Sequence, residues 1–379
     1  MQKIKTDFLI VGSGFYGCVL AERISSVLKK KVTIIEKRNH IGGNCYSEID
    51  KPTGIEYHKY GTHIFHTSIK RVIDYLNDFA KFNSYRHQVL SSYKNKIYQM
   101  PINLETINDY YSKNFSPQEA EEFIKIKANK FLRKNYNNFE EKAKSQIGQD
   151  LYEAFFKNYT KKQWGKDPVN LPGSIFNRLP IRYNYNEDYY KNPILQGIPT
   201  NGYTEIFKKL VFSKNIKIIY NHEYSLKKKY NVKYLTIYTG PLDKLFNYKY
   251  GSLEWRSLLF KKKSFLTKDF QGTSVINYPE LKFKYTRIHE PKHLHPERNY
   301  KDKTLVIEEF PVKNNSEPYY PINTDENRST QKKYLALLNS LKNQKIICGG
   351  RLADYAYYDM DMTISAALKK FDFINKIYK

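Results

Sequence analysis

Residues 8–17 read FLIVGSGFYG, a short apolar run that passes directly into a turn with glycine at positions 12, 14 and 17. An amphipathic run follows, and a second apolar stretch, Val32 to Ile35, ends on Glu36. A strand, a glycine-rich turn, a helix, a second strand and a terminal acid in this order are typical of a dinucleotide-binding unit. The sequence therefore predicts an α/β protein with a Rossmann-type domain and a dinucleotide at the turn.

Each glycine of this turn has a physical role. Gly12 permits the tight turn, Gly14 lets the backbone approach a pyrophosphate, and Gly17 lets the helix pack closely on the strand. The helix N-terminus offers free N–H groups and a partial positive charge to the phosphates. Glu36 is placed to accept a hydrogen bond from a ribose hydroxyl, which favours an adenosine without a 2′-phosphate. A glycine loop that only turns the chain is the alternative.

Two further glycine pairs extend the prediction to a flavin. Gly42-Gly43 follows closely behind Glu36 and suits a loop across which a cofactor larger than nicotinamide lies. Near the other end of the chain, an apolar strand runs into Gly349-Gly350-Arg351 just before a closing helix. The N-terminus of that helix and Arg351 would face the pyrophosphate, so this stretch is predicted to be the second half of a flavin site.

The composition indicates a globular protein of two or three domains, because 379 residues exceed one ordinary core. The sequence contains no run long enough to cross a bilayer and no apolar leader with a cleavage site. The three cysteines, Cys18, Cys45 and Cys348, form no CxxC pair. They are interpreted as reduced thiols, which predicts a cytoplasmic protein.

A net charge of +26 raises the question of a nucleic-acid partner. The excess is almost all lysine spread along the whole chain, whereas arginine, which binds phosphate bidentately, is scarce. A compositional bias explains this better than a groove for a polyanion, so no nucleic-acid partner is predicted. An anionic small substrate would still be attracted to such a protein.

The spacing of the apolar residues divides the chain into domains. After residue 68 the spacing is helical, and Ser116-Pro117-Gln118-Glu119 is a capping box that opens a helix with an apolar face running to Leu132. Alternating patterns predict strands at Thr273–Tyr278, Phe283–Ile288 and Thr304–Phe310. We expect a discontiguous FAD-binding domain at 1–68, 198–245 and 340–379, an inserted helical domain with a mobile loop at 69–182, and an antiparallel sheet domain at 183–197 and 246–339.

Histidines, aromatic residues and arginines supply candidate site residues. His63-x-x-His66 lacks nearby carboxylates or thiolates, so no metal site is predicted, and an imidazole beside Gly61 is placed to face the flavin instead. The histidines at positions 289, 293 and 295 are interpreted as a solvated turn. The aromatic side chains Phe155, Tyr159 and Trp164 are either core or a stacking wall for a base. Two arginines on the Pro/Gly-rich stretch 166–202 are either structural or a clamp for a diphosphate.

Six blocks of sequence carry a resemblance to a known family. They are IIEKRNHIGGN at 34–44, HKYGTHIFHT at 58–67, YTKKQWG at 159–165, YTRI at 285–288, EPYYP at 317–321 and GGRLADYAYYDM at 349–360. The glycine fingerprint is shared by many flavoproteins, but HKYG, KQWG and YYDM are specific. On these residues the chain resembles the bacterial UDP-galactopyranose mutases, flavoenzymes that interconvert the pyranose and furanose forms of UDP-galactose.

The resemblance implies roles for particular residues. The implied catalytic residues are His63 at the flavin face, Arg182 on the mobile loop, where it reaches a phosphate when the loop closes, and Arg287. The implied substrate-binding residues are Phe155, Tyr159, Trp164, Arg178, Asn277, Tyr320 and Tyr357. The implied cofactor-binding residues are Gly12, Ser13, Gly14, Phe15, Gly17, Glu36, Lys37, Arg38, Gly43, Asn44, His63, Arg256, Arg351, Asp359 and Met360.

The resemblance also implies the chemistry. No side chain stands out as a nucleophile, and in the family N5 of the reduced flavin attacks C1 of the sugar and displaces UDP, so that the ring can open and close again. FAD would be active when reduced, with a reductant such as NAD(P)H, and the product would supply galactofuranose for surface glycans. The alternatives are an FAD-dependent oxidase or dehydrogenase of the same fold, and a non-enzymatic polyanion-binding protein. A homodimer and the use of UDP-N-acetylgalactosamine are left open.

One segment departs from the family pattern. Leu195 stands before Gln196-Gly197-Ile198-Pro199, where relatives carry a tyrosine that contacts a phosphate. Tyr189 or Tyr190 is the alternative source of that hydroxyl.

Overall fold

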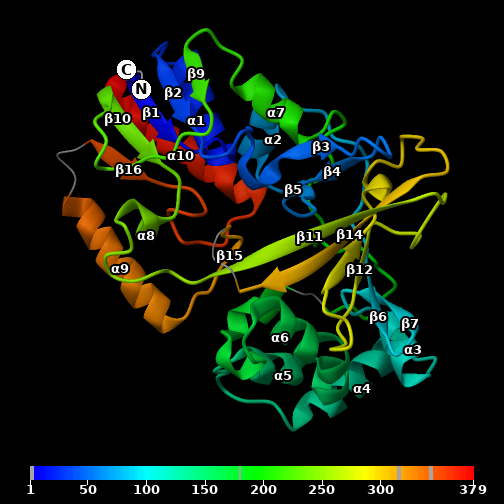
Figure 1. Cartoon of the computed structure of the whole chain (residues 1–379). Coiled ribbons are helices and arrows are strands. Elements are labelled where there is room, and N and C mark those ends of the chain that lie inside the picture. Colours follow the sequence, from blue (N-terminus) through cyan, green and yellow to red (C-terminus); the bar gives the residue numbers. More distant parts are fainter. Residues whose placement is uncertain (1–3, 179–180, 314–316, 341–344) are drawn as a thin grey trace.

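The computed structural model describes residues 4–178, 181–313, 317–340 and 345–379. Figure 1 shows a parallel sheet with its helices near the two termini, a long antiparallel sheet across the middle, and a group of helices beyond it. The predicted fold class, an α/β protein with a Rossmann-type domain, a helical bundle and an antiparallel sheet, is confirmed.

Five parallel strands form the Rossmann sheet, in the order β16-β10-β1-β2-β9. Their bounds are β1 Lys5–Val11, β2 Val32–Ile35, β9 Ile216–Ile219, β10 Asn231–Tyr238 and β16 Ile346–Cys348. β1 is central, and its Ile10 pairs with Ile34 on one side and Ile237 on the other. The carboxyl ends of parallel strands lie at one edge, so the segments that begin at Gly12 and Glu36 emerge side by side there.

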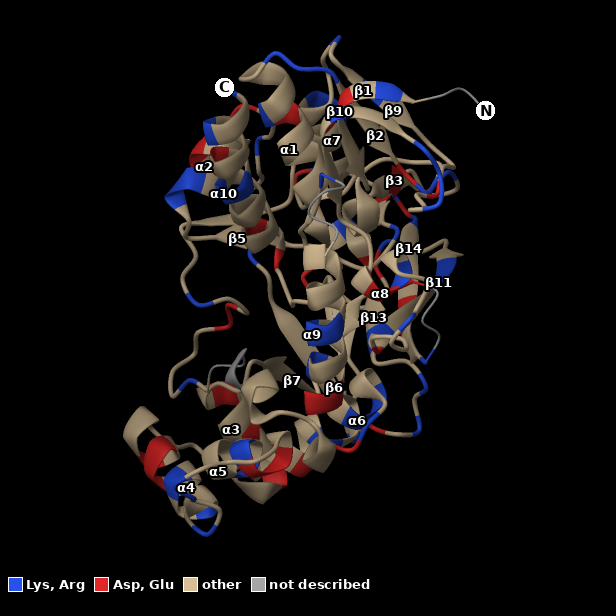
Figure 2. Ribbon diagram, turned by 90° about the vertical axis from the view of Figure 1, so that its left-hand side faces the viewer, with Lys and Arg blue, Asp and Glu red and all other residues tan. Residues whose placement is uncertain are grey.

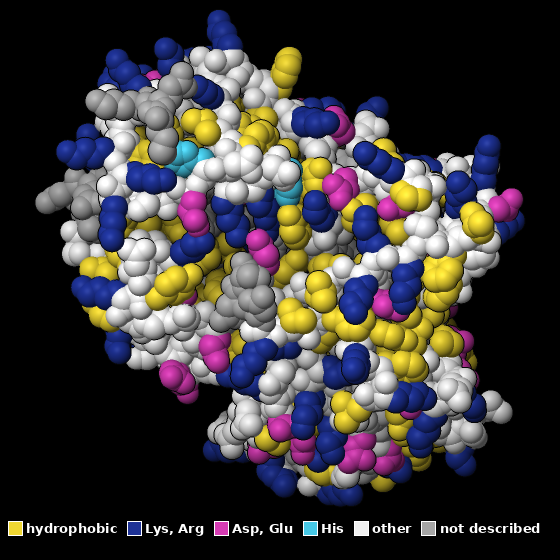
Figure 3. Space-filling view, in the orientation of Figure 1, with side chains coloured by type: hydrophobic (Ala, Val, Ile, Leu, Met, Phe, Trp, Pro, Cys, Tyr) yellow, Lys and Arg dark blue, Asp and Glu magenta, His cyan; other side chains and the backbone are white. Residues whose placement is uncertain are grey.

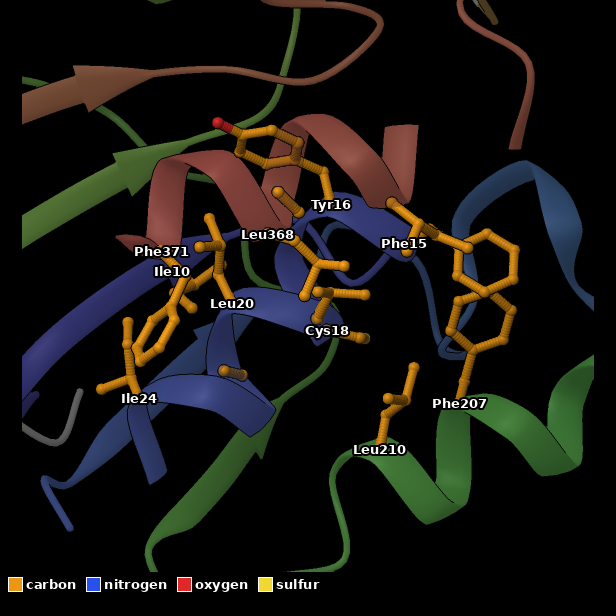
Figure 4. Close-up of a cluster of buried hydrophobic side chains, with 14 of the residues drawn as sticks. Ile10, Phe15, Tyr16, Cys18, Leu20, Ile24, Phe207, Leu210, Leu368 and Phe371 are labelled. Atoms are coloured by element: carbon orange, nitrogen blue, oxygen red, sulfur yellow. The ribbon is translucent and has the colours of Figure 1, made fainter. Parts of the chain in front are cut away.

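The side chains of β1 alternate between two cores, which explains why its apolar run is unbroken. Phe8 and Ile10 belong to the core on the α1 side, whereas Leu9 and Val11 belong to the core on the α8–α9 side. Figure 4 shows the first core, where Phe15 of α1 and Phe207 of α7 lie with ring centroids 4.5 Å apart. The helices of these two layers are α1 Phe15–Ser26, α2 Lys70–Leu76, α7 Tyr203–Leu210, α8 Leu242–Leu245, α9 Asp325–Ser340 and α10 Met360–Tyr378.

Seven strands form the second sheet, in the order β15-β11-β14-β13-β12-β6-β7. Its longest pairing joins β11 and β14, from Ser257 opposite Val312 to Phe265 opposite Thr304. The strand bounds are β6 Val89–Tyr93, β7 Lys96–Met100, β11 Trp255–Phe265, β12 Val275–Asn277, β13 Arg287–His289, β14 Thr304–Val312 and β15 Tyr320–Pro321. Two small pairs, β3 Ser47–Ile49 with β4 Glu56–His58 and β5 Phe65–Thr67 with β8 Leu195–Gly197, lie outside these sheets.

Two sequence predictions for the second sheet are wrong. The strand predicted at Phe283–Ile288 begins only at Arg287, because the preceding residues form a turn in which the rings of Phe283 and Tyr285 stack 5.4 Å apart. The three histidines are not a solvated turn either. His289 lies in β13 and His295 is 1% exposed, because each imidazole has a carboxylate partner.

The helical region contains α3 Leu104–Tyr111, α4 Pro117–Asn129, α5 Phe139–Leu151, a π-helical turn at Tyr152–Lys157 and α6 Asn158–Trp164. The predicted capping box is present: the Ser116 hydroxyl accepts from the Glu119 N–H, and the Glu119 carboxylate accepts from the Ser116 N–H. The predicted length is wrong, since α4 ends at Asn129 and Leu132 is exposed.

Several elements lie in a different region from the one predicted. The hairpin β6–β7 falls inside the span assigned to the helical domain, yet β6 pairs with β12 and extends the second sheet. Helix α2 also falls in that span, but its Val72 and Leu76 are buried in the core of the Rossmann domain. Helix α9 lies against α8, and its Tyr334 shares a core with residues of the Rossmann strands β1 and β10. Among the described residues, no helix is both long and apolar enough to cross a membrane.

Candidate active site

One cavity of ≈ 1430 Å³ lies between the Rossmann sheet and the antiparallel sheet. Figure 3 shows one face of the molecule, with blue Lys and Arg side chains around a recess at the middle of that face. Many of the predicted site residues line it. They are Gly12, Ser13, Gly14, Phe15, Gly17, Glu36, Lys37, Arg38, Gly43, Asn44, His63, Asn277, Arg287, Tyr320, Arg351, Tyr357, Asp359 and Met360.

The three glycines of the turn meet the steric demands that the prediction placed on them. Gly12 has φ +105°, and a Cβ there would lie 2.2 Å from Oγ1 of Thr239. A Cβ on Gly17 would lie 2.1 Å from the carbonyl oxygen of Gly12, so only glycine lets α1 start this close to the turn. Nothing lies within 4 Å of the position of a Cβ on Gly14. The turn therefore presents bare backbone to the cavity beside that residue.

The carboxylate of Glu36 ties the ends of β1 and β2 together. One oxygen accepts from the N–H and the hydroxyl of Ser13 at 2.9 and 2.8 Å, and the other accepts from the N–H of Arg38 at 2.9 Å. The Glu36 side chain is buried at the edge of the cavity. The ribose contact of Glu36 stays a prediction.

Sequence reasoning missed two partners of the basic pair that follows Glu36. Glu317 forms ion pairs with both Lys37 and Arg38, and the guanidinium of Arg38 also lies 4.0 Å from the centre of the Tyr60 ring. Tyr60 and Glu317 both lie within sequence blocks that carry the resemblance. No pattern in the residues around them marked either one as a site residue. They fix Arg38 against the cavity wall.

The imidazole of His63 is half-buried and held in one tautomer. Its Nδ1–H donates to the carbonyl oxygen of Gly61 at 2.6 Å, which leaves Nε2 as an acceptor. Burial lowers the pKa of His63 to about 4, and the Gly61 contact only partly opposes this shift. The ring is therefore neutral at physiological pH and lines the cavity.

A buried carboxylate, Glu309, organises the wall opposite the glycine turn. It accepts from Nε2 of His289 at 2.9 Å and pairs with the Arg287 guanidinium at 3.5 Å. The other ring nitrogen of His289 meets the Thr62 hydroxyl at 3.0 Å, next to His63. Burial alone would raise the pKa of Glu309, but Arg287 and His289 lower it overall, so it is ionised.

Stacked aromatic rings and an arginine form the third side of the cavity. The rings of Tyr320 and Tyr357 lie 5.5 Å apart and nearly parallel, with the Arg351 guanidinium 5.4 and 4.9 Å from their centres. Nε of Arg351 is buried without a hydrogen-bond partner among the described residues. Asp359 is the N-cap residue of α10 and Met360 its first residue, so the free N–H groups of a 19-residue helix face the same space.

Three predicted aromatic contacts lie outside the lining of the cavity. Phe155 is a core side chain, 4% exposed and packed among tyrosines of the helical region such as Tyr98. Of the two alternatives for these aromatic residues, core or stacking wall, Phe155 is a core residue. Tyr159 and Trp164 lie directly behind the lining, with the Tyr159 ring 5.8 Å from the Arg287 guanidinium and the Trp164 ring 6.2 Å from that of Tyr320.

Arg256 does not reach the predicted cofactor site. Its buried guanidinium donates to the carbonyl oxygens of Gln163 and Lys162 at 2.9 and 3.2 Å. These are backbone acceptors at the end of α6, which leaves orphan carbonyls as every helix end does. Arg256 thus stabilises the C-terminus of α6 and lies outside the lining of the cavity.

The two loop arginines lie in different situations. The backbone of Arg178 ends a 3₁₀ helix at Gly173–Arg178, and its side chain lies outside the described residues. Arg182 donates to the carbonyl oxygens of Asn186 and Tyr190 at 3.3 and 3.5 Å, at the margin of the cavity and not in its lining. Its reach to a phosphate stays a prediction.

The structure also places the residues of the segment around Leu195 that differs from the family pattern. Leu195 lies in β8, paired with Thr67, and packs against the core of the Rossmann domain. Tyr189 and Tyr190 both line the cavity. Tyr190 stacks on His66 with centroids 3.6 Å apart, a contact that sequence reasoning missed.

A second cluster of ligand-type side chains lies away from this cavity. Asp269, Glu290 and His293 bring atoms that can bind a metal close together. The buried Glu290 already accepts from the backbone N–H groups of Phe270 and Gln271. The Glu290 oxygens are thus used to hold the turn, and no metal is assigned to the cluster.

The chain matches two known families and close relatives within one of them. It matches UDP-galactopyranose mutase over residues 154–357 and the NAD(P)-binding Rossmann-like domain over residues 10–79. It is 39% identical to a probable UDP-galactopyranose mutase of Klebsiella pneumoniae, over 97% of this chain and 94% of the relative. It is 38% identical to a dTDP-fucopyranose mutase of Escherichia coli, over 95% of this chain and 96% of the relative. The crystal structure of a reduced UDP-galactopyranose mutase superposes with a TM-score of 0.77 over 98% of this chain and 96% of that one, at 14% identity, which supports the fold.

The Rossmann turn, the helix N-terminus of α10 and the basic and aromatic wall meet in one cavity, and with the mutase family match they define a flavin-dependent enzyme that acts on a nucleotide sugar. The identity to full-length relatives specifies which one. The chain belongs to the UDP-galactopyranose mutase family. The predicted resemblance and the predicted isomerase class are confirmed.

Proposed function

We propose that the protein interconverts UDP-galactopyranose and UDP-galactofuranose with FAD as its cofactor. The observation that carries this proposal is that one cavity joins the glycine turn to the wall of Arg287, Tyr320 and Tyr357. Its volume of ≈ 1430 Å³ exceeds the roughly 300–1,000 Å³ of a usual single-ligand pocket. A dinucleotide and a nucleotide sugar would therefore lie end to end in it.

The residues at the glycine turn fit FAD. Bare backbone at Gly14, the N-terminus of α10 and the unpartnered Nε of Arg351 would bind the pyrophosphate and the ribityl chain. Glu36 would bind a ribose hydroxyl. When bound, reduced FAD supplies the nucleophile that no side chain of this cavity offers.

The opposite wall would bind and release the diphosphate. Glu309 holds Arg287 by one edge, so the rest of the guanidinium is available to a phosphate. Burial raises the pKa of Tyr320, so its phenol stays protonated and donates. Donors fixed around a leaving diphosphate stabilise the charge that develops on it when the bond to the sugar breaks.

The nucleobase would lie between Asn277 and the rings behind Arg287. Oδ1 of Asn277 is buried and has no hydrogen-bond partner among the described residues. It would accept from the ring N–H that uracil and thymine both carry. This wall therefore suits a base with a ring N–H, as uracil and thymine have and cytosine has not, and it does not by itself separate UDP from dTDP sugars.

His63 would keep the flavin face free of an extra positive charge. With Nδ1–H held by Gly61, Nε2 is a fixed hydrogen-bond acceptor at the cavity. A neutral imidazole there accepts a hydrogen bond and adds no positive charge beside the reduced cofactor.

The test is to purify the protein, record its visible spectrum, reduce it with dithionite and supply UDP-galactose. We expect a yellow protein, conversion to the furanose by the reduced form only, and no stoichiometric use of reductant. Equal turnover by the oxidised enzyme, or a colourless protein that takes up no flavin, would refute the proposal. dTDP-fucopyranose must be assayed beside UDP-galactose, because a relative of nearly equal identity acts on that sugar. UDP-N-acetylgalactosamine tests the tolerance at the sugar.

The same experiments separate the two rival functions. An FAD oxidase or dehydrogenase would show substrate-dependent flavin reduction. A polyanion-binding protein would bind heparin with a steep salt dependence. Figure 2 shows Lys and Arg on every region of the ribbon, which favours a general excess of charge over one binding patch. We further propose NAD(P)H as the reductant, a cytoplasmic location and a homodimer, which flavin reduction under anaerobic conditions, cell fractionation and sedimentation would test.

A further inference from the structure

The ammonium group of Lys162 lies inside the turn that joins β12 to β13. Nζ donates to the backbone carbonyl oxygens of Tyr278 at 2.5 Å, Glu280 at 3.0 Å, Phe283 at 3.1 Å and Tyr285 at 2.9 Å. An ammonium has three N–H groups, so the four acceptors share them. The turn is thus wrapped around one charge that belongs to a distant part of the chain.

This turn connects two residues of the proposed nucleotide site. Asn277 ends β12 and Arg287 begins β13, and the two pair across the hairpin. Lys162 itself lies in α6, three residues after Tyr159 and two before Trp164. Its side chain therefore links the helix behind the cavity to the hairpin that forms the wall.

Other contacts fix the base of Lys162 without replacing its ammonium. Arg256 of β11 donates to the carbonyl oxygen of Lys162, and the Thr286 hydroxyl meets Oε1 of Gln163 at 3.0 Å. Both hold the end of α6. The four carbonyl oxygens of the turn point at Nζ, and without a cation they would repel one another.

We propose that Lys162 is a positioning residue for nucleotide binding: its ammonium holds the β12–β13 hairpin at the distance from α6 at which Tyr159, Asn277 and Arg287 close on one nucleotide. This inference rests on the proposed function, since only there does the nucleobase lie between Asn277 and the rings behind Arg287, of which Tyr159 is one. The Arg287 guanidinium lies 5.8 Å from the Tyr159 ring, a spacing that the Lys162 contacts maintain.

The geometry separates this role from a purely structural one. β12 is also paired with β6, and β13 with β14, and neither of these pairings involves the turn. Loss of the ammonium would therefore open the tip of the hairpin and leave the sheet intact. The effect should appear in nucleotide affinity and not in flavin content.

The first experiment measures UDP binding to the flavin-loaded enzyme by calorimetry at pH 7. Lys162→Met, which keeps an unbranched apolar stem, should weaken UDP binding by about tenfold, the effect of one charge-assisted hydrogen bond put out of reach. Lys161→Met is the matched control, because Lys161 is the exposed neighbour whose Nζ pairs with Asp167 at 2.7 Å. The control should bind UDP as the wild type does, and both variants should keep full FAD.

The second experiment uses pH and does not depend on that variant folding. Burial lowers the pKa of Lys162 to about 8, against a smaller opposing effect of Glu280, while burial raises the pKa of Tyr278 and Tyr285, which therefore stay neutral. The other charged groups near the site are the Arg287 guanidinium, which does not titrate here, the Glu309 carboxylate, whose pKa is lowered, and the Glu280 carboxylate, which pairs with the Lys282 ammonium at 3.3 Å. UDP affinity of the wild type should fall several-fold between pH 7 and pH 9. Lys162→Arg, which stays charged, should lose this dependence.

The outcomes are distinct. If the wild type binds UDP but Lys162→Met binds it equally well, or if Lys162→Arg keeps the alkaline loss, the positioning role is wrong and the proposed function stands. If the wild type binds no UDP, the proposed function fails first and this inference fails with it.

Discussion

The two ends of the cavity are built in different ways. At the cofactor end, the contacts that shape the glycine turn join groups close in sequence: Gly17 lies against Gly12, and Glu36 binds Ser13. At the nucleotide end, the β12–β13 hairpin is joined to α6 by contacts across more than 100 residues, such as those of Lys162 with the turn. At the glycine turn, the steric fit of the backbone decides which residues are tolerated. The wall at the nucleotide end depends instead on buried polar contacts. Substitutions at the two ends should therefore fail differently.

Gly17→Ala should have the largest effect. Its new Cβ would lie 2.1 Å from the Gly12 carbonyl oxygen and 3.1 Å from Cγ2 of Ile10, so α1 and β1 must move apart. Urea unfolding should show a loss of about 3 kcal/mol, with FAD lost as well. The control is Gly14→Ala, whose Cβ meets open space. It should change the free energy of unfolding by less than about 0.5 kcal/mol yet weaken FAD binding. Full FAD and normal stability in Gly17→Ala would contradict this account.

Arg182→Ala should impair catalysis without touching the cofactor. Its present partners are backbone carbonyls at 3.3 and 3.5 Å, which a phosphate would replace easily. We expect kcat to fall by about one to two orders of magnitude, the effect of a charge-assisted hydrogen bond that strengthens as UDP leaves. Arg182→Lys should recover little of the rate, because lysine cannot bind bidentately. Steady-state kinetics with a flavin spectrum checks both, and an active or flavin-free Arg182→Ala would show that the assignment is wrong.

The pH dependence of stability should differ between two histidines. The folded pKa of His63 is lowered to about 4, so between pH 4 and 6.5 the unfolded chain binds the extra proton. Stability from this residue is complete above pH 6.5 and is lost as the pH falls toward 4, by at most about 1.4 kcal/mol per pH unit. His63→Gln should flatten that slope in urea titrations. For His293, Glu290 and Asp269 raise the pKa against the effect of burial, so its contribution is lost as the pH rises instead. His293→Gln must therefore act in the opposite sense, and equal behaviour of the two variants would contradict the assignment.

Asn138→Ala should have the smallest effect. The Asn138 side chain accepts from the N–H of Glu141 at 2.9 Å and caps α5, and it lies outside the lining of the cavity. Thermal unfolding should show a loss of about 1 kcal/mol, with FAD content and UDP binding unchanged. Asn137→Ala is the matched control, since Asn137 contributes only its backbone N–H to Glu141. A loss of UDP binding in Asn138→Ala would mean that the helical region is coupled to the site.

The cofactor end was predictable because its signal is local. The strands at residues 8 and 32, the three glycines and Glu36 lie within one stretch, and their order alone specifies how they meet. The capping box at Ser116 was predictable for the same reason. In both cases the partners lie within reach of a short segment of chain.

The rest required the tertiary structure. Strand β11 was missed because its second half, rich in lysine, is exposed and shows no alternation. The hairpin β6–β7 was missed because Lys94 and Asn95 make its turn with positive φ in place of a glycine. Phe155 and Arg256 carry the residue types expected of a site, yet one fills a core and the other binds the end of a helix. Only packing distinguishes these uses.

The carboxylate of Glu36 has a consequence for how the cofactor enters. Because it accepts from both the N–H and the hydroxyl of Ser13, the glycine turn is held in shape by a side chain of the protein itself. Ordering a loop upon association usually costs affinity, and this carboxylate lowers that cost. Protein stripped of flavin should therefore take FAD up again in one fast, single-exponential phase, and Glu36→Ala should convert it into slow, biphasic uptake in stopped-flow fluorescence.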